Sequence, residues 1–136
     1  MKIMLDEGAK MPTRAHPYDA GLDLYAMESL FVFSGSRQTF DTGVHVQIPE
    51  GCYGEIRSRS GLMVKHGITT DGTIDCGYTG SIRVCLFNHG EDDFYVEAGD
   101  KIAQLVIVPC VLLPMEVVDS FEETDRGNGG FGSTGR

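Results

Sequence analysis

Short runs of alternating apolar and polar residues, separated by turn residues, dominate the chain. They predict strands at 44–48, 53–58, 82–87, 94–97 and 102–108, with a weaker strand at 115–118. Nowhere do apolar residues recur every 3.6 positions over a dozen residues, as they would in a long amphipathic helix. The pattern predicts an all-β fold, a distorted jelly-roll β-sandwich or barrel, with one short helix and a flexible Gly-rich C-terminal arm.

The one predicted helix covers residues 60–65. It begins at Ser60, a residue type that can cap a helix, and stops before Gly67. Arg57 and Arg59 stand beside its start, where N–H donors and the positive dipole end favour an anion. A connector with two solvated arginines is the alternative, and the composition favours neither interpretation.

Charge and length limit the possible partners. The chain has 136 residues and a net charge of −9, which argues against general nucleic-acid binding. A phosphate ligand would need a local group of Arg and Lys or a metal ion. No signal peptide is visible, and no apolar run approaches the roughly 20 residues of a membrane helix. We therefore expect one cytoplasmic domain that binds neither nucleic acid nor membranes.

The cysteines and histidines form no metal-binding pattern. The four cysteines are widely spaced and lack a C-x-x-C pair, and the four histidines show no ligand spacing. The cysteines are therefore predicted to be buried free thiols in a reducing cytosol, rather than a zinc site or a disulfide framework.

Residues 125–136 differ from the rest of the chain, because they contain five glycines and one aromatic residue. Such a segment is either a disordered tail or a lid that orders over a ligand. Glycine lets successive amides turn toward phosphate oxygens, and Ser133 and Thr134 add hydroxyl donors. Arg126 adds charge, and Phe131 offers a flat face for a base.

A turn-dense stretch, 72–80, separates two predicted strands. Asp75 follows Ile74, so its carboxylate would stand at the end of a strand. There it could bind a sugar hydroxyl or take a proton from water. The alternative is that Asp75 and Tyr78 are surface residues without a function.

Five segments, in order, resemble the motifs of one family, the trimeric dUTP pyrophosphatases (dUTPases). The segments are 20–26, 59–62, 72–80, 99–105 and 126–135. Each is weak alone, but five in order at the family's spacing form a strong signal. The resemblance extends from about residue 15 to the end of the chain.

The resemblance implies hydrolysis of dUTP to dUMP and pyrophosphate with Mg²⁺. This reaction removes dUTP from the DNA precursor pool and supplies dUMP for dTMP synthesis. The resemblance also implies a homotrimer with its active sites between subunits. Residues 1–120 would form the jelly-roll domain, and residues 121–136 would form an arm that closes over a neighbouring subunit's active site.

The resemblance also assigns roles to single residues. Asp75 matches the family's water-activating aspartate, and Tyr78 matches the tyrosine under the sugar that excludes ribonucleotides. Asp23 matches a carboxylate that holds Mg²⁺ through water, the ion being otherwise held by the substrate phosphates. The other implied substrate-binding positions are Arg59, Ser60, Gly61 and Gln104 at the phosphates, Gly72, Thr73, Ile74 and Arg83 near uracil, and Arg126, Phe131, Gly132, Ser133 and Thr134 in the arm.

Two other functions fit the same resemblance less well. A dCTP deaminase relative is disfavoured because Cys85 stands where those enzymes carry a glutamate, and Tyr78 where they tend to carry Trp or Phe. A non-catalytic nucleotide-binding or regulatory protein of this fold is disfavoured by the complete set of motif residues. The sequence departs from the family in having Ser58, not proline, before Arg59, and in a shorter hairpin at 67–71 without the family's asparagine.

Overall fold

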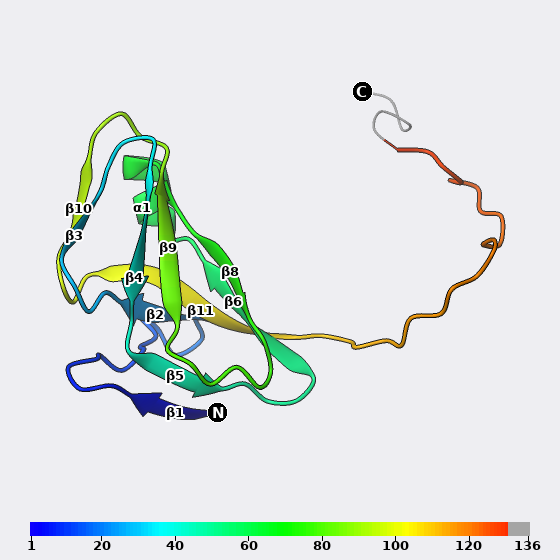
Figure 1. The fold of residues 1–136 in the computed structure, drawn as a ribbon, viewed down its shortest axis with the longest axis horizontal. Coiled ribbons are helices and arrows are strands. Elements are labelled where there is room, and N and C mark those ends of the chain that lie inside the picture. Colours follow the sequence, from blue (N-terminus) through cyan, green and yellow to red (C-terminus); the bar gives the residue numbers. More distant parts are fainter. Residues whose placement is uncertain (131–136) are drawn as a thin grey trace.

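The computed structural model describes residues 1–130 and is built almost entirely from antiparallel strands (Figure 1). Its elements are β1 (Lys2–Leu5), β2 (Gly21–Tyr25), β3 (Leu30–Val32), β4 (Arg37–Asp41), β5 (Val44–Gln47), β6 (Cys52–Arg57), α1 (Ser60–His66), β7 (Ile68–Thr69), β8 (Asp71–Ile74), β9 (Arg83–Asn88), β10 (Phe94–Val96) and β11 (Lys101–Pro109). The predicted all-β fold with one short helix is confirmed.

The strands form hydrogen-bonded groups that do not close into a barrel. The largest sheet has the order β2-β11-β6-β8, and a second has the order β4-β9-β7. Two further pairs, β1 with β5 and β10 with β3, complete the described part of the fold. Neighbouring strands are mostly distant in sequence, as in a jelly roll.

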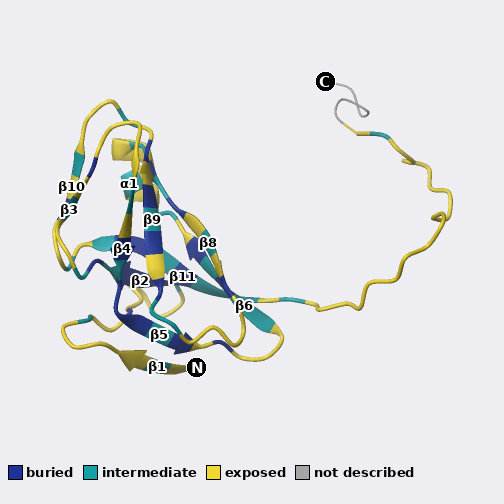
Figure 2. Cartoon of the chain, viewed as in Figure 1, coloured by how far each residue is buried: buried dark blue, intermediate teal, exposed yellow. Residues whose placement is uncertain are grey.

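Side chains from both larger sheets meet in one apolar core. Leu24, Ile56 and Leu105 come from the first sheet, and Phe40 and Leu86 from the second. Inward and outward residues alternate along β9, which is the period of a strand with one buried face. Figure 2 shows this buried centre beneath exposed loops. The core therefore gives a rigid base to the loops between the strands.

Helix α1 occupies the predicted place, with one difference at its start. Arg59 rather than Ser60 is the N-cap, and it makes no side-chain cap hydrogen bond. The helix ends at Gly67, whose positive φ of 67° allows its N–H to bond the Met63 carbonyl. No helix among residues 1–130 is long and apolar enough to cross a membrane.

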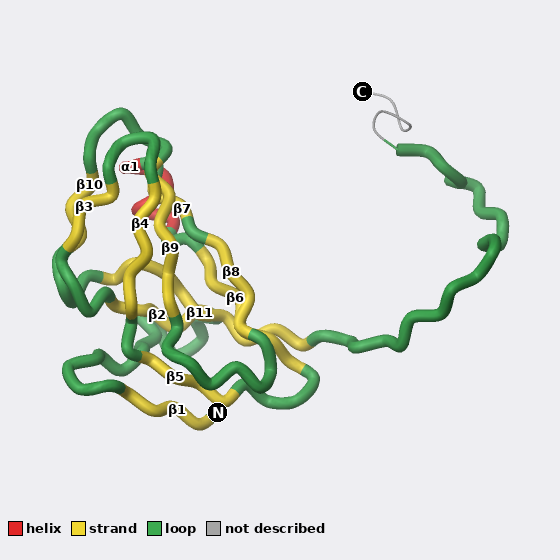
Figure 3. The backbone as a smooth tube through the Cα atoms, in the orientation of Figure 1, coloured by secondary structure: helices red, strands yellow, loops and turns green. Residues whose placement is uncertain are grey.

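The predicted strand at 115–118 is wrong. After β11 the chain runs extended and without regular structure, away from the body (Figure 3). Val111, Leu112, Met115 and Val117 are 81–100% exposed. Within the described residues no strand pairs with this segment, and an unpaired strand leaves its backbone groups without partners.

The cysteines are free, as predicted, but they are not buried. Cys76 is exposed, and Cys52, Cys85 and Cys110 are half-buried. Residues 1–130 contain no cluster of three His, Cys, Asp or Glu side chains that could hold a metal ion.

Candidate active site

The first group of candidate residues surrounds the carboxylate of Asp23, which is only 2% exposed. Lys101 Nζ lies 2.8 Å from Asp23 Oδ2. Arg59 Nε lies 3.5 Å from Oδ1, and the Gln104 amide donates to the same oxygen at 3.3 Å. Asp23 therefore collects two cations and one amide donor at a single buried point.

The strand register brings these residues together. Gln104 on β11 lies directly opposite Asp23 on β2, and Lys101 lies opposite Tyr25, beyond a bulge in β11. Gly21 leaves room for the Gln104 side chain, because a Cβ there would lie 3.0 Å from the Gln104 Cδ. A larger residue at position 21 would push that amide away from Asp23.

Arg59 reaches the same group from the start of α1. Its guanidinium also donates to the Lys101 carbonyl at 3.2 Å. Because Arg59 makes no side-chain cap bond, the N–H groups of Ser60 and Gly61 have no capping partner within residues 1–130 and lie beside this arginine. Arg57 does not join the group, because it pairs with Glu55 on the surface.

Electrostatics make this group a place for an anion. The hydrogen bond that Lys101 donates to Asp23, and then the charge of Asp23, raise the pKa of Lys101, so the ammonium stays charged at neutral pH. Two cations around one carboxylate leave an excess of positive charge. In a protein of net charge −9, such a local excess is the kind of site that a phosphate ligand needs.

The second group follows the edge of the largest sheet. β8 is the last strand of that sheet and pairs on one side with β6. Within residues 1–130, the outward backbone groups of Gly72, Thr73 and Ile74 have no ladder partner. Asp75 follows directly, exposed at the strand end as predicted.

The loop from 75 to 82 holds Tyr78 in a defined position. The Tyr78 N–H bonds the Asp75 carbonyl at 3.0 Å, and its hydroxyl donates to the Ser81 carbonyl at 3.0 Å. The ring lies against Gly80, where a Cβ would come within 2.5 Å of the Tyr78 hydroxyl oxygen. The ring is still 45% exposed, so a ligand can pack on it.

Arg83 stands beyond this loop, at the start of β9. Its Nε lies 3.7 Å from Asp41 Oδ2, and its side chain is 71% exposed. Burial alone would raise the pKa of Asp41, but hydrogen bonds from Ser81 and the Gly43 N–H, with the charge of Arg83, lower it overall. Asp41 therefore stays ionised and fixes one end of the loop.

The two groups do not converge within one chain. Arg57 on β6 lies opposite both Gln104 and Asp71, whereas Gly54 lies opposite Ile74. Asp75 thus stands four strand positions from the level of Gln104, roughly 13 Å along the sheet, and two strands to the side.

Arg126 lies in the segment that leaves the body. Its Nε donates to the Gly129 carbonyl at 3.0 Å, closing a local turn in which Gly127 has a positive φ of 46°. Phe131, Gly132, Ser133 and Thr134 lie outside the described residues.

Asp23 fits a magnesium ion only through water. Both of its oxygens already accept from Lys101, Arg59 or Gln104, and the side chain is buried. Magnesium commonly keeps several waters and binds one or two carboxylates together with substrate phosphates. The surroundings of Asp23 therefore fit the predicted indirect role and leave no oxygen for direct coordination.

Lys101 is the candidate that the sequence interpretation missed. It stands inside the fourth motif-like segment, 99–105, yet no role was predicted for it. The spacing gave no signal, because Lys101 precedes the predicted strand at 102–108, and residues three apart on a regular strand face opposite sides. A bulge between Lys101 and Ala103 breaks that alternation. Only the pairing of β11 with β2 shows that its ammonium reaches Asp23.

Comparison with known proteins identifies the family of the chain. The dUTPase family model matches residues 7–135. A deoxyuridine 5'-triphosphate nucleotidohydrolase of Clostridium tetani is 48% identical, over 98% of this chain and 94% of the relative. The enzyme of the same name from Gloeothece citriformis is 47% identical, over 96% and 92% of the two chains.

Solved structures show the same fold. The Staphylococcus bacteriophage 80alpha dUTPase with dUpNHpp superposes with a TM-score of 0.93 at 32% identity, over 99% of this chain and 98% of that chain. A variant dUTPase of S. aureus phage phi11, described with a structural Mg(II) ion, gives a TM-score of 0.83 at 30% identity, over 90% and 98%. The chain therefore belongs to the dUTPase family.

Proposed function

We propose that this protein is a dUTP diphosphatase, which hydrolyses dUTP to dUMP and pyrophosphate. The gathering of Arg59, Lys101 and Gln104 around buried Asp23 carries the proposal. A triphosphate has about four negative charges, so its binding requires fixed cations and donors. A relative named deoxyuridine 5'-triphosphate nucleotidohydrolase, 48% identical to this chain, supports it.

The open edge of β8 would read the base. Outward N–H and C=O groups of Gly72, Thr73 and Ile74 can match the O4 and N3–H edge of uracil. Cytosine would leave donors and acceptors of that edge mismatched, which is costly where water is excluded. Arg83, at the start of the neighbouring β9, would contribute from the facing side.

Tyr78 would support the deoxyribose. Its ring is held by the Ser81 carbonyl and by contact with Gly80, so it cannot easily move aside. A sugar packed against it leaves no room for a 2′-hydroxyl, and UTP would be excluded. Asp75, three residues earlier, would hold the 3′-hydroxyl.

Asp75 would act as the general base. Within residues 1–130 no hydrogen bond or ion pair occupies its carboxylate, so it can take a proton from water. The water oxygen then bonds to the α-phosphorus, and the bond from that phosphorus to the bridging oxygen of pyrophosphate breaks. Arg59, Lys101 and the donors of Ser60, Gly61 and Gln104 would stabilise the charge on the phosphoryl oxygens.

Magnesium would supply further charge neutralisation on the phosphates. Asp23 would hold it through water, as the occupied state of both carboxylate oxygens requires.

The complete site would lie between subunits of a homotrimer. The roughly 13 Å that separate Asp75 from the level of Gln104 along the sheet support this proposal, since one nucleotide would then contact two chains. Residues 1–120 would form the jelly-roll domain. Residues 121–136 would form an arm over a neighbour's site, bringing Arg126, Phe131, Gly132, Ser133 and Thr134 to the base and phosphates.

The exposed apolar residues after β11 support the same assembly. Leu112, Leu113 and Val117 are 76–99% exposed on the isolated chain, and apolar patches of this kind mark contact surfaces. Such a trimer would work in the cytoplasm, where the four free thiols stay reduced.

Pyrophosphate release from dUTP, dCTP, dTTP and UTP, with and without magnesium, tests the function. We expect turnover of dUTP alone, and much less of it without magnesium. Ammonia release from dCTP, or binding of dUTP without turnover, would contradict the proposal.

A further inference from the structure

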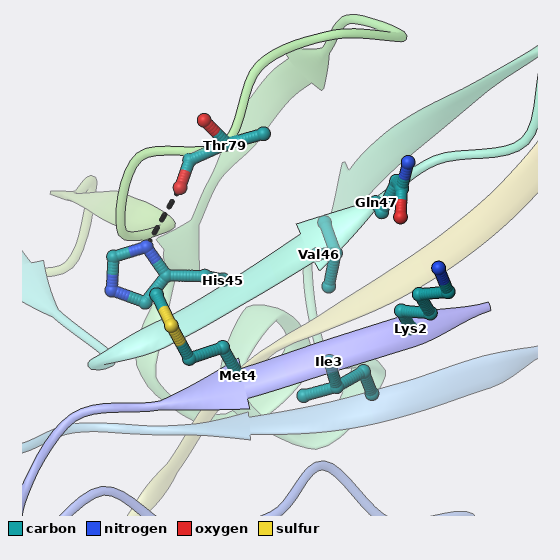
Figure 4. Close-up of a pocket in the computed structure, with 7 residues that line it drawn as sticks. All are labelled: Lys2, Ile3, Met4, His45, Val46, Gln47 and Thr79. Carbon is teal, nitrogen blue, oxygen red and sulfur yellow. Dashed lines mark hydrogen bonds between the residues drawn. The ribbon is translucent and has the colours of Figure 1, made fainter.

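The ring of His45 on β5 is held between two segments that are distant in sequence. Its Nδ1 lies 2.8 Å from the Thr79 carbonyl oxygen, and its Nε2 lies 3.1 Å from Asp6 Oδ1. Figure 4 shows the ring below and to the left of Thr79, in a pocket that Lys2, Ile3 and Met4 also line. The side chain is only 17% exposed, so the ring has a fixed place.

Thr79 belongs to the same loop as the proposed base. It follows Tyr78 directly and lies four residues after Asp75. Both hydrogen bonds of Tyr78 are internal to the loop. Between Asp75 and Gly80, His45 provides the shortest hydrogen bond to the rest of the body in the described residues; the other, from the Cys76 thiol to the Ile48 carbonyl, is 3.5 Å long.

Both hydrogen-bond partners of the His45 ring are acceptors, so the ring must carry a proton on each nitrogen to bond both of them. A carbonyl oxygen and an ionised carboxylate can only accept. A neutral imidazole has one N–H, so it can satisfy Thr79 or Asp6 but not both. The observed arrangement therefore suits an imidazolium, which has two N–H donors.

The surrounding charges agree with a protonated ring. The Thr79 carbonyl raises the pKa of His45, and Asp6 and then Asp41 add to this, against a smaller opposing effect of burial. Asp6 faces the ring from the turn after β1, and Asp41 from the end of β4. Arg83 neutralises part of the Asp41 charge, and Lys2 lines the same pocket on β1.

We infer that His45 is a positioning residue for the loop that carries Asp75 and Tyr78, and that its doubly bonded ring makes this positioning sensitive to pH. The inference rests on the proposed function, because it assigns Asp75 and Tyr78 to substrate. His45 itself touches no proposed ligand and acts through the Thr79 carbonyl.

The direction of the pH effect follows from the raised pKa. The stabilisation that protonated His45 gives to the folded state is complete below the ordinary histidine pKa of about 6.5. It is lost as the pH rises through the higher pKa of His45 in the folded protein. The neutral ring has one N–H, so it loses either its bond to Thr79 or the bond to Asp6 that holds the ring beneath Thr79. The loop is therefore held most firmly on the acid side.

Two substitutions distinguish the contribution of the His45–Thr79 bond from that of the His45–Asp6 bond. In His45→Asn, the side-chain amide replaces Nδ1–H toward Thr79 and leaves Asp6 without a partner at every pH. In Asp6→Asn, the amide can accept from the imidazolium and donate to the neutral ring, so both bonds persist at every pH. His16→Asn is the matched control, since the His16 ring makes no hydrogen bond within residues 1–130.

The experiment compares hydrogen exchange of a peptide covering 75–80 with kcat/KM for dUTP, from about pH 5.5 to about pH 8.5. After correction for intrinsic exchange, we expect the wild-type protein and His16→Asn to lose protection about three- to tenfold across this range, the effect of one hydrogen bond. Protection should stay low in His45→Asn and high in Asp6→Asn, and kcat/KM should follow.

A wild-type loop whose protection is unchanged across the range overturns the inference, as does a His45→Asn profile that follows the wild type. If the wild-type protein hydrolyses no dUTP, the proposed function fails instead. The exchange profiles then still decide whether His45 holds the loop.

Discussion

Asp23 and Asp75 are both carboxylates, and their surroundings separate their tasks. Asp23 is 2% exposed and accepts from Lys101 and Gln104, so it cannot take a proton from water without breaking these contacts. Asp75 is exposed at the end of β8, with an unoccupied carboxylate in the described part of the chain. Surroundings, not residue type, distinguish Asp23, which holds cations, from Asp75, the proposed base.

Asp75→Asn tests this separation. The amide keeps the size of the side chain and cannot take a proton, so we expect dUTP binding to persist and turnover to fall by at least ~100-fold. Single-turnover kinetics and a binding titration with a non-hydrolysable analogue would measure both. Turnover close to that of the wild-type protein would refute the assignment of the base.

Gly21→Ala tests the packing under Gln104. The new Cβ would lie 3.0 Å from the Gln104 Cδ and displace the amide from Asp23, so we expect KM for dUTP to rise several-fold. A double-mutant cycle with Gln104→Ala checks the cause. If Gly21→Ala acts through Gln104, it adds nothing in the Gln104→Ala background, whereas additive effects would show a different cause.

At the scale of elements, β6 connects both halves of the proposed site. It pairs with β11 on one side and with β8 on the other, and it leads into Arg59 at the start of α1. Ser58, the residue between β6 and Arg59, donates to the Thr70 carbonyl at 2.9 Å and accepts from the Thr70 N–H at 2.8 Å. One hydroxyl thus ties the helix start to the corner between β7 and β8.

Ser58→Ala should loosen that corner. The buried Thr70 N–H would lose its acceptor, at a cost of about 1–3 kcal/mol in the free energy of unfolding. Ser36→Ala is the control, because the exposed Ser36 hydroxyl makes no hydrogen bond in residues 1–130. Chemical denaturation of both variants measures the difference, and equal stabilities would show that the Ser58 hydroxyl contributes nothing.

Sequence patterns predicted some elements well and missed others for physical reasons. Strand β11 and helix α1 were predicted because an apolar run and a stop at Gly67 are local signals. Strand β2 was missed because it is only five residues long, and its polar residue Asp23 is buried between Leu22 and Leu24, so the alternation does not mark an outward face. The role of Lys101 was missed because it depends on which strand lies beside β11.

At the scale of the whole molecule, the apolar run at 115–118 shows what a single chain cannot reveal. Its composition indicates a strand, but no strand of the described chain pairs with it. A high β-propensity lets a segment form a strand, but the strand also needs a neighbouring strand with free backbone N–H and C=O groups. In the proposed trimer that partner would belong to another subunit.

Deletion of residues from Asp125 onward tests the arm. The core and every strand of residues 1–130 lie at or before Pro109, so we expect the truncated protein to fold and keep its oligomeric state. Efficient turnover should be lost, because Arg126 and the segment after it are removed. Light scattering and pyrophosphate release measure the two properties, and full activity of the truncated protein would show that the arm is dispensable.

A site shared between subunits, as proposed, predicts that two inactive variants complement each other when they are mixed. Asp75→Asn and Arg59→Ala each spoil a different half, so each homotrimer would be inactive on its own. When the two are denatured together at equal amounts and refolded, about a quarter of the sites would combine one chain's intact cation cluster with the other's intact base. The refolded mixture of two inactive variants would then hydrolyse dUTP. If each chain contained a complete site, the mixture would stay inactive.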